Sequence, residues 1–270
     1  MEQPKGFEVK GKKKLMCKLN RSLYGLKQSP RCWYKRFDDY ISLIGFIRSL
    51  YDPCVYYKKL TEGDYIYLLL YVDDMLLAGR DPTKLKEIKA QLSAEFDMKD
   101  LGAAKKILVE ILRDRNTNEL SLIQKTYTNK VLCRFNMANS KVTTPLAQHI
   151  KISARDSPKD PTDRQAMSYV SYSNATGSLM YLMVCTRPDL AHSSSIVNRY
   201  MGNPGKIHWE ATKWVFRYLV GTENRGLLYK PPKDFKLRVR GFVDANFAGD
   251  PDKIRLLTGF AFTLGENLIS

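Results

Sequence analysis

The chain has few of the residues from which metal centres and covalent frameworks are built. Its five cysteines are odd in number and scattered, and no two of them have CxxC spacing. Its three histidines are isolated from one another. These counts argue against a disulfide framework and against a zinc site. We expect the thiols to be core or surface residues in a reducing compartment.

Long apolar runs and the short motifs of several enzyme classes are also missing. The sequence has no apolar run of about eighteen residues, so we expect no membrane-spanning helix. A polar, basic stretch follows Met1, so we expect no signal peptide and no secretion. The patterns GxSxG, HExxH and GxxxxGK[ST] do not occur. Their absence argues against a serine hydrolase, a zinc protease and a P-loop nucleotidase.

Positive charge is what the chain has in excess. Lys+Arg 44 against Asp+Glu 28 gives a net charge of +16. Residues 1–36 hold eleven Lys/Arg and two Glu, which supplies +9 of that total. A basic surface of this size predicts a polyanionic partner, most simply a nucleic-acid backbone. A solvated basic face and a membrane surface are the alternatives, and no basic amphipathic helix with a large apolar face supports the membrane.

Hydrophobic periodicity predicts helices and strands in a definite order. Ser29-Pro30 is typical of an N-cap followed by proline at the first helical position, and Asp81-Pro82 opens a second helix in the same way. Residues 140–168 are polar and proline-containing, which predicts a linker. The remaining elements are hairpins at 65–78 and 106–124, helices at 175–185, 188–201 and 207–219, and strands at 237–243 and 259–264.

The first helix and the hairpin after it have the clearest patterns. Trp33, Phe37, Tyr40, Ile41 and Ile44 recur at helical spacing and predict one buried face. In the hairpin, two adjacent carboxylates interrupt two apolar runs, 65–72 and 75–78. A polar break of two residues predicts a tight turn with the acids at its tip.

Asp73 and Asp74, the acids of Tyr71-Val72-Asp73-Asp74, have two interpretations. A rigid hairpin that presents two carboxylates is a good cradle for Mg²⁺, which prefers hard oxygen ligands. Asp is also simply a common turn residue, and these four residues alone leave both interpretations open.

A basic block, residues 24–31, precedes the first helix. Gly25 would let the backbone approach a ligand closely. Lys27 and Arg31 could contact phosphates. The alternative is a capped helix with ordinary basic neighbours.

Taken together and in order, these segments resemble the reverse transcriptase of copia-type retrotransposons. The resemblance covers essentially the whole chain, and its C-terminal part looks like the opening of a ribonuclease H domain. It is carried by Met1–Pro4 with Gly6-Phe7, Tyr24–Arg31 with Trp33, Asp52–Tyr56, Tyr71–Asp74, Phe96–Gly102, Gly177–Leu182, Thr186–Asp189, His208–Glu210 and Gly241–Ala245 with Gly249-Asp250.

The resemblance implies metal-dependent chemistry. Asp73 and Asp74 would be the paired aspartates of a polymerase palm that transfers nucleotides with two Mg²⁺ ions, Mn²⁺ being the alternative. Asp244 would be the first metal ligand of ribonuclease H. The implied partners are an RNA template, an RNA–DNA hybrid and deoxynucleotides, with no membrane.

The resemblance also implies residues that contact nucleic acid or nucleotide. These would be Lys27, Gln28, Arg31 and Tyr71. A member of this family is expected in the cytoplasm, in a virus-like particle, or in the nucleus.

The expected fold class is α+β. Residues 1–140 would form an incomplete palm sheet with packed helices and the start of the thumb, and 141–168 the linker. Residues 169–235 would form a helical thumb and connection, and 236–270 the first strands of a ribonuclease H-like domain. No sequence feature indicates an oligomeric state.

The sequence also predicts that this chain does not polymerise. In the family a third aspartate precedes the segment that matches Met1, and the chain would therefore be truncated there and at Ser270. Two carboxylates without the third should bind Mg²⁺ weakly. The alternative functions are a non-catalytic nucleic-acid-binding remnant and a decayed reading frame, whose unpaired sheet edge would favour aggregation.

Overall fold

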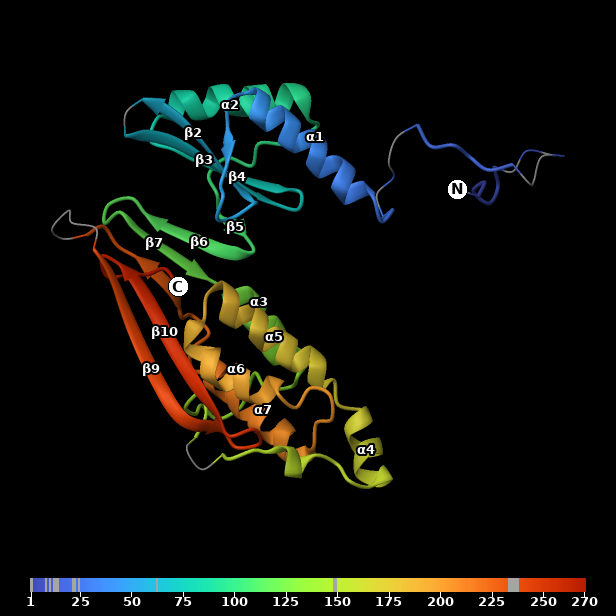
Figure 1. Ribbon diagram of the computed structural model, residues 1–270, viewed down its shortest axis with the longest axis vertical. Coiled ribbons are helices and arrows are strands. Elements are labelled where there is room, and N and C mark those ends of the chain that lie inside the picture. The colour runs from blue at the N-terminus through green and yellow to red at the C-terminus, as the bar shows by residue number, and fades with distance from the viewer. Residues whose placement is uncertain are drawn as a thin grey trace. The chain divides into compact units, whose positions relative to one another are not determined.

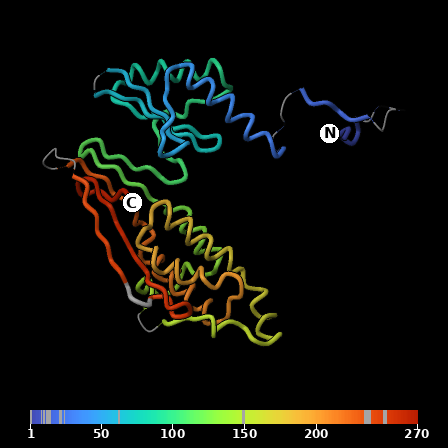
Figure 2. Tube along the Cα trace, viewed as in Figure 1, coloured from blue at the N-terminus to red at the C-terminus, as the bar shows by residue number. Residues whose placement is uncertain are grey.

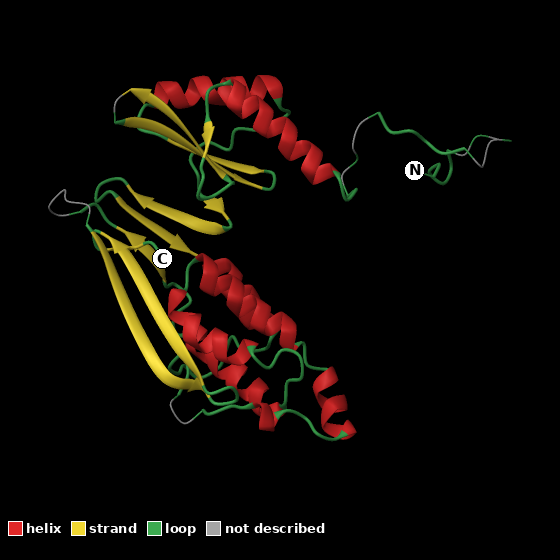
Figure 3. Ribbon diagram, viewed as in Figure 1, coloured by secondary structure: helices red, strands yellow, loops and turns green. Residues whose placement is uncertain are grey.

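The computed structural model describes residues 2–7, 9, 11, 15–20, 23, 25–61, 63–147, 150–232 and 238–270. It has helices and antiparallel sheets, which agrees with the predicted α+β class (Figure 3). The chain divides into two compact units, residues 1–102 (unit 1) and residues 103–270 (unit 2), and the colour along the trace follows this order (Figure 2). No helix within the described ranges is long and apolar enough to cross a membrane.

Unit 1 is a four-stranded antiparallel sheet in the order β1-β2-β3-β4. Two helices, α1 (Ser29–Leu43) and α2 (Pro82–Glu95), lie on the same side of this sheet (Figure 1). The strands are β1 (Ile47–Arg48), β2 (Val55–Thr61), β3 (Asp64–Tyr71) and β4 (Asp74–Ala78). The buried core between helices and sheet consists of Phe37, Ile41, Phe46, Tyr56, Ile66, Leu68, Leu70, Ile88 and Leu92.

The predicted apolar face of α1 is confirmed, and the predicted cap is not. Phe37 and Ile41 are fully buried, with Trp33, Tyr40 and Ile44 packed around them. The N-cap is Gln28 and not Ser29, and it forms no side-chain cap. The Ser29 hydroxyl instead donates to the Leu23 carbonyl oxygen at 2.5 Å. A hydroxyl that bonds its own preceding loop is the usual competitor of a helix cap.

Helix α2 begins as the sequence predicts. The Asp81 carboxylate accepts hydrogen bonds from the backbone N–H groups of Thr83 at 2.8 Å and Lys84 at 3.4 Å, and Pro82 occupies the first turn. Ile88 and Leu92 are buried on the helix face that meets α1 and the sheet. Capping of two otherwise unpaired N–H groups therefore fixes where this helix starts.

Removing this cap should destabilise unit 1 measurably. We expect Asp81→Ala to lower the free energy of unfolding by about 1 kcal/mol, because the N–H groups of Thr83 and Lys84 lose their acceptor. Urea denaturation followed by the fluorescence of Trp33 would measure the change. Asp39→Ala, on an exposed position of α1, is the control, and an equal loss in both variants would contradict the capping argument.

Unit 2 opens with a second antiparallel sheet in the order β5-β6-β7-β8. The strands are β5 (Lys106–Ile107), β6 (Val109–Asp114), β7 (Glu119–Ile123) and β8 (Gly226–Tyr229). The predicted hairpin at 106–124 is present, but its first strand is divided. The chain reverses at Leu108, whose φ is 57°, so that Ile107 pairs with Val109. A leucine in the left-handed region gives no sequence signal of a turn.

The helices of unit 2 follow the sheet and surround one core (Figure 1). Helices α5 (Tyr172–Cys185) and α7 (Lys206–Val220) confirm the predicted helices there, whereas the predicted helix at 188–201 is a 3₁₀ turn followed by α6 (Ala191–Asn198). Two further helices are α3 (Lys125–Arg134) and α4 (Pro161–Ser168), with a 3₁₀ turn at Ala154–Asp156. The core consists of Val131, Leu132, Met137, Ile152, Ala175, Leu179, Leu182, Leu190, Val197, Tyr200, Ala211, Val215, Phe216, Tyr218 and Leu219.

The segment read as a linker, residues 141–168, contains structure. Helix α4 starts at an Asp160 cap, whose carboxylate accepts from the Asp163 N–H at 2.9 Å. Ile152 and Met167 are buried. The predicted domain boundary at residue 140 lies inside unit 2, because strand β8 returns across a hundred residues to pair with β7.

The chain ends in a third sheet, in the order β11-β10-β9. Its strands β9 (Val239–Asp250), β10 (Arg255–Leu264) and β11 (Asn267–Leu268) extend well beyond the two predicted strands. Leu237, where the first was expected to begin, lies outside the described residues. Several large apolar side chains of β9 and β10 are exposed, among them Phe242, Val243 and Phe260. This sheet therefore contributes little to the core of unit 2.

Candidate active site

The β3–β4 hairpin carries the two predicted aspartates. Tyr71, the last residue of β3, pairs with Asp74, the first of β4, so the two-residue turn is Val72-Asp73 and not Asp73-Asp74. The buried side chains of Leu68 and Leu70 anchor β3 in the core behind this turn. The hairpin end is therefore held by a packed sheet, as the sequence predicts, with the turn shifted by one residue.

The turn has a strained backbone at Val72, whose φ is 54°. A β-branched residue in the left-handed region is a true outlier. Strain of this kind costs roughly 1–3 kcal/mol and persists only where the surroundings impose it. Here the register from Tyr71↔Asp74 back to Tyr67↔Ala78 imposes it. The same register places Asp73 in the turn at the end of the hairpin.

Both carboxylates are available to a ligand. Asp73 and Asp74 are exposed, and no ion pair of the described chain involves either of them. Two adjacent carboxylates with free lone pairs suit a hard divalent cation. No three His, Cys, Asp or Glu side chains gather in a metal-holding arrangement anywhere in the described ranges. The donor set thus fits part of a metal site, with two carboxylates.

The other polymerase residues expected from the sequence lie at the start of α1. Lys27, Gln28 and Arg31 are all exposed there, and Gln28 is the N-cap. Gly25 has a φ of 91°, a conformation that favours glycine. Tyr24 lies outside the described residues. Among the described residues, no hydrogen bond or ion pair joins Lys27, Gln28 or Arg31 to Tyr71, Asp73 or Asp74, so they form two separate groups within unit 1.

Asp244, the predicted ribonuclease H ligand, is an exposed residue in the middle of β9, opposite Gly259 on β10. A nearby acid has a structural role. Asp250 is buried at the end of β9, accepts hydrogen bonds from the N–H groups of Asp252 and Lys253, and lies 3.6 Å from Arg199. These contacts fix the β9–β10 turn to the helices of unit 2.

A buried cation in unit 2 is a feature that the sequence analysis did not single out. Arg187 is only 2% exposed and donates to both carboxylate oxygens of Asp189, at 2.9 and 2.7 Å. It also donates to the carbonyl oxygen and the hydroxyl of Thr222, at 2.9 and 2.8 Å. Tyr218 donates to Asp189 at 2.7 Å and lies beneath the guanidinium. The adjacent Arg187-Pro188-Asp189 was the only sequence signal of this network.

The network changes the ionisation of Asp189. Partial burial acts to raise the pKa of its carboxyl, but hydrogen bonds from Arg187 and Tyr218 and the charge of Arg187 outweigh that effect. The pKa of Asp189 is therefore lowered below its ordinary value. Each guanidinium nitrogen of Arg187 and the hydroxyls of Tyr218 and Thr222 donate to an acceptor, which is the arrangement of a structural clamp.

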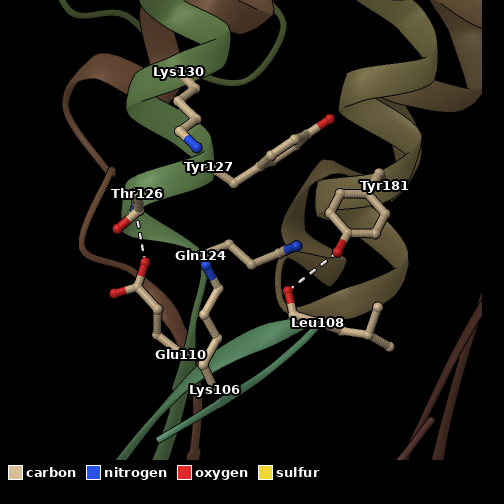
Figure 4. Close-up of a pocket in the computed structure, with 8 residues that line it drawn as sticks. All are labelled: Lys106, Leu108, Glu110, Gln124, Thr126, Tyr127, Lys130 and Tyr181. Atoms are coloured by element: carbon tan, nitrogen blue, oxygen red, sulfur yellow. Dashed lines mark hydrogen bonds between the residues drawn. The ribbon is translucent and has the colours of Figure 1, made fainter. Parts of the chain in front are cut away.

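Unit 2 also has a pocket that the sequence does not predict. It has a volume of about 200 Å³ and lies where β5 and β6 meet α3 and α5 (Figure 4). Its lining residues are Lys106, Leu108, Glu110, Gln124, Thr126, Tyr127, Lys130 and Tyr181. The reversal at Leu108 forms part of its wall, so no local pattern could have predicted it.

Comparison with known proteins places these features in a family. The profile described as reverse transcriptase (RNA-dependent DNA polymerase) matches residues 1–148, which include the β3–β4 hairpin and the start of α1. No solved structure matches the chain.

Two curated Pol polyproteins match over the full length of this chain, and a third relative matches over part of it. The Pol polyprotein of transposon TNT 1-94 from Nicotiana tabacum is 49% identical over 272 residues, covering 100% of this chain and 20% of that protein. The Pol polyprotein of transposon RE1 from Arabidopsis thaliana is 37% identical over 273 residues, covering 100% and 18%. An uncharacterised mitochondrial protein of Arabidopsis thaliana is 36% identical over 207 residues, covering 76% and 81%. The chain thus spans about a fifth of the length of the Pol polyproteins, and it belongs to the reverse transcriptase (RNA-dependent DNA polymerase) family, as a region of a copia-type Pol polyprotein.

Proposed function

We propose that the β3–β4 hairpin is the catalytic element of an RNA-directed DNA polymerase that joins deoxynucleotides along an RNA template. The observation that most directly supports this proposal is that Tyr71-Val72-Asp73-Asp74 forms the end of a packed hairpin in a chain of the reverse transcriptase family. Asp73 and Asp74 would hold Mg²⁺ or Mn²⁺. Such ions, when bound, lower the pKa of an attacking hydroxyl and stabilise charge on the phosphate and the leaving group.

The protein's own contribution is to position groups. The packed sheet and the strained turn at Val72 fix the backbone that carries the two carboxylates, which would keep a bound cation in one place. The exposed Lys27 and Arg31 would contact template or primer phosphates, and Gln28 would contact the incoming nucleotide. Tyr71 would contact the nucleic-acid strand that lies over the hairpin. The proposal requires that the start of α1, with Lys27, Gln28 and Arg31, and the β3–β4 hairpin face the same nucleic-acid duplex.

The remaining assignments belong to the same proposal. Residues 1–140 would be the palm and the start of the thumb, 141–168 the linker, and 169–235 the helical thumb and connection. Residues 236–270 would be the first strands of a ribonuclease H-like fold, with Asp244 as a metal ligand. The protein would act in the cytoplasm, in a virus-like particle, or in the nucleus.

The 270-residue chain alone should not extend a primer. Within the described ranges no third acidic side chain joins Asp73 and Asp74, and too few charged ligands bind such ions weakly. The test is extension of an oligo(dT) primer on poly(rA) with Mg²⁺ and separately with Mn²⁺. Incorporation by the chain alone that disappears in Asp73→Asn would contradict the proposed inactivity.

The positive half of the test uses the tobacco relative. In its Pol polyprotein the matching 272 aligned positions would be replaced by this chain, and the product should extend the same primer. If the replaced polyprotein folds and binds the template–primer but incorporates nothing, the hairpin of this chain is not a polymerase element.

Nucleic-acid binding without catalysis is the second candidate, favoured by the net charge of +16. Arg31 and Lys35 are exposed on α1, off its apolar face. We expect the chain to bind an RNA–DNA hybrid, with affinity falling by about 10³-fold between 50 and 200 mM salt if about six phosphates are contacted. Fluorescence anisotropy with a labelled hybrid would measure this.

Two matched variants on α1 sharpen this measurement. Arg31→Ala together with Lys35→Ala should reduce the salt slope by about two. Arg36→Ala is the control, because Arg36 is already paired with Glu95 at 2.9 Å. Binding that does not depend on salt would rule out a backbone-reading function.

A further inference from the structure

Strand β9 is the open edge of the third sheet. It stands last in the order β11-β10-β9 and forms the outer border of that sheet in Figure 1. Its residues from Val239 to Ala245 are all exposed. They pair with β10 in an unbroken register, because the irregularity of this hairpin lies further on, between Arg255 and Leu257. An exposed, regular edge of this length is a template to which another strand can add.

Every second residue of β9 directs its backbone groups to this edge. The Gly265 N–H donates to the Arg238 carbonyl oxygen at 2.9 Å, so the backbone groups of Arg238 face β10. The direction of these groups alternates along a strand. The N–H of Phe262, which lies opposite Gly241, agrees with this alternation, because it donates to the Ser270 main-chain oxygen on the β11 side at 2.7 Å. The residues whose backbone groups face the open edge are therefore Val239, Gly241, Val243 and Ala245.

The charges along this edge are complementary to those of a reversed copy of the same strand. Arg240 and Asp244 are exposed, and neither forms an ion pair within the described part of the chain. Both lie on the same face of β9, with the exposed Phe242 midway between them. The segment from Arg240 to Asp244 therefore has opposite charges at equal distances from its centre.

We propose that β9 is a dimerisation surface, on which a second copy of this chain adds its own β9 antiparallel, with the two-fold axis at Phe242. Arg240 of each copy then lies opposite Asp244 of the other, so the ion pair forms twice. These two positions are a non-hydrogen-bonded pair, in which the Cα atoms approach to about 4.5 Å and the side chains are closest. The hydrogen-bonded pairs between the copies are Gly241 with Val243 and Val239 with Ala245.

The charge pattern favours a second copy over an unrelated strand. Any extended segment can bond the backbone groups of the edge, whereas the reversed β9 also meets each charge with its opposite. A register centred on Gly241 would instead place Arg240 opposite Phe242. The dimer occupies Asp244, so dimer formation and a metal ion at Asp244 are alternative states of this strand. The proposal concerns self-association and does not depend on the function assigned to the β3–β4 hairpin.

Sedimentation equilibrium of the 270-residue chain tests the proposal. At about 0.15 M salt, the general repulsion between two chains of net charge +16 is screened beyond about 8 Å, while pairs in contact are not. The mass should rise from that of one chain to that of two between about 1 and 200 µM, the range of a small interface. It should rise no further, because a two-fold axis uses the same edge of both copies and closes the assembly.

Charge reversals identify the register. Arg240→Asp alone and Asp244→Arg alone should each weaken the dimer by about tenfold or more, because each places two pairs of like charges across the axis. An equimolar mixture of the two variants should recover the original affinity within about threefold, because the two changed residues then face each other with opposite charges. One chain that carries both changes should dimerise equally well. With the axis at Gly241, that chain would not dimerise, since Arg238 would face the arginine introduced at position 244.

A backbone variant tests the edge itself. Val243→Pro removes an N–H that faces the open edge and leaves the ladder to β10 intact, so the folded chain should stay monomeric. Val243→Ala, the matched control, keeps the N–H and should dimerise within about threefold of the unaltered chain. Circular dichroism would show that each variant is folded.

Three results would overturn the proposal. A chain that stays monomeric over the whole concentration range would leave the edge to a different strand. Dimers that survive Val243→Pro would place the interface elsewhere on the molecule. Single charge reversals that dimerise as tightly as the unaltered chain would remove the pairing of Arg240 with Asp244. If one single variant fails to fold, the chain that carries both changes decides.

Discussion

Replacing Arg187 by methionine should lower the free energy of unfolding of unit 2 by about 3 kcal/mol. Methionine fills much of the space but leaves the carbonyl oxygen and hydroxyl of Thr222 without their donors. It also leaves Asp189 without the cation that faces it at 2.7 Å. Because Asp189 is itself 37% exposed, water recovers part of the loss, which places the cost at the lower end for a broken buried ion pair.

A lysine at position 187 should restore only part of the stability that methionine loses. Arg187 donates in two directions at once, to Asp189 and to Thr222, and a single ammonium cannot reproduce that fork. We expect Arg187→Lys to cost about 2 kcal/mol, and Arg225→Met, on an exposed position after α7, less than about 0.5 kcal/mol. Urea denaturation followed by the fluorescence of Trp209 and Trp214 reports on unit 2. A methionine variant as stable as the Arg225→Met control would show that the clamp contributes nothing.

The same variant should change the acid sensitivity of the protein. The folded-state pKa of Asp189 is lowered, so its contribution to stability is complete above its unfolded pKa of about 3.9 and is lost as the pH falls through the folded value. Without Arg187 the folded pKa moves up towards the unfolded one. The free energy of unfolding of Arg187→Met should therefore fall less steeply below pH 4 than that of the unaltered protein.

Periodic burial is the part of the fold that the sequence could predict. The stripe from Trp33 to Ile44 buries one face of α1 because residues three and four apart share a face of a helix. Asp81-Pro82 fixed the start of α2, and Asp160-Pro161 has the same signature at the start of α4. This second pair lies in the segment predicted as a linker, where proline is equally consistent with a break in secondary structure.

Other elements depend on contacts that no local window contains. Strand β8 pairs with β7 across about a hundred residues, and a four-residue strand is too short for its hydrophobic pattern to predict it. At Leu108 and Val72 the chain turns through left-handed conformations that glycine or asparagine would signal and that leucine and valine do not. Tertiary packing imposes both turns.

The residues of the candidate site also differ in how far the sequence predicts them. The break between two apolar runs placed Asp73 and Asp74 at a hairpin tip, because the buried strands on both sides leave only the turn for charged residues. The position of the Gln124 amide at the pocket of unit 2 could not be predicted, since it requires Thr186, distant in sequence, to hold one end of the side chain. Residue type and spacing can thus indicate a site carried by one hairpin, whereas a pocket lined by several elements is visible only in the folded structure.

The largest functional effect is expected at the hairpin, in the tobacco Pol polyprotein that carries this chain. Asp73→Asn and Asp74→Asn should each lower the rate of primer extension by about a hundredfold or more, because misplacement of one reactive partner already costs that much. Asparagine keeps the size of the side chain and one oxygen but removes the charge that a divalent cation requires. Both positions are exposed and form no ion pair within the described part of the chain, so the thermal midpoint should stay within about 2 °C.

Asp39→Asn is the matched control for these two substitutions. It makes the same chemical change on an exposed position of α1 in the same unit and should leave the extension rate within about twofold. Template–primer affinity, measured by anisotropy at fixed salt, should be unchanged or slightly tighter in all three variants, because each removes a negative charge from a polyanion-binding protein. A rate loss accompanied by an equal loss of affinity would assign the hairpin to binding. A rate loss at constant affinity assigns Asp73 and Asp74 to the chemical step, since only groups that act in the transition state lower the rate without weakening the bound state.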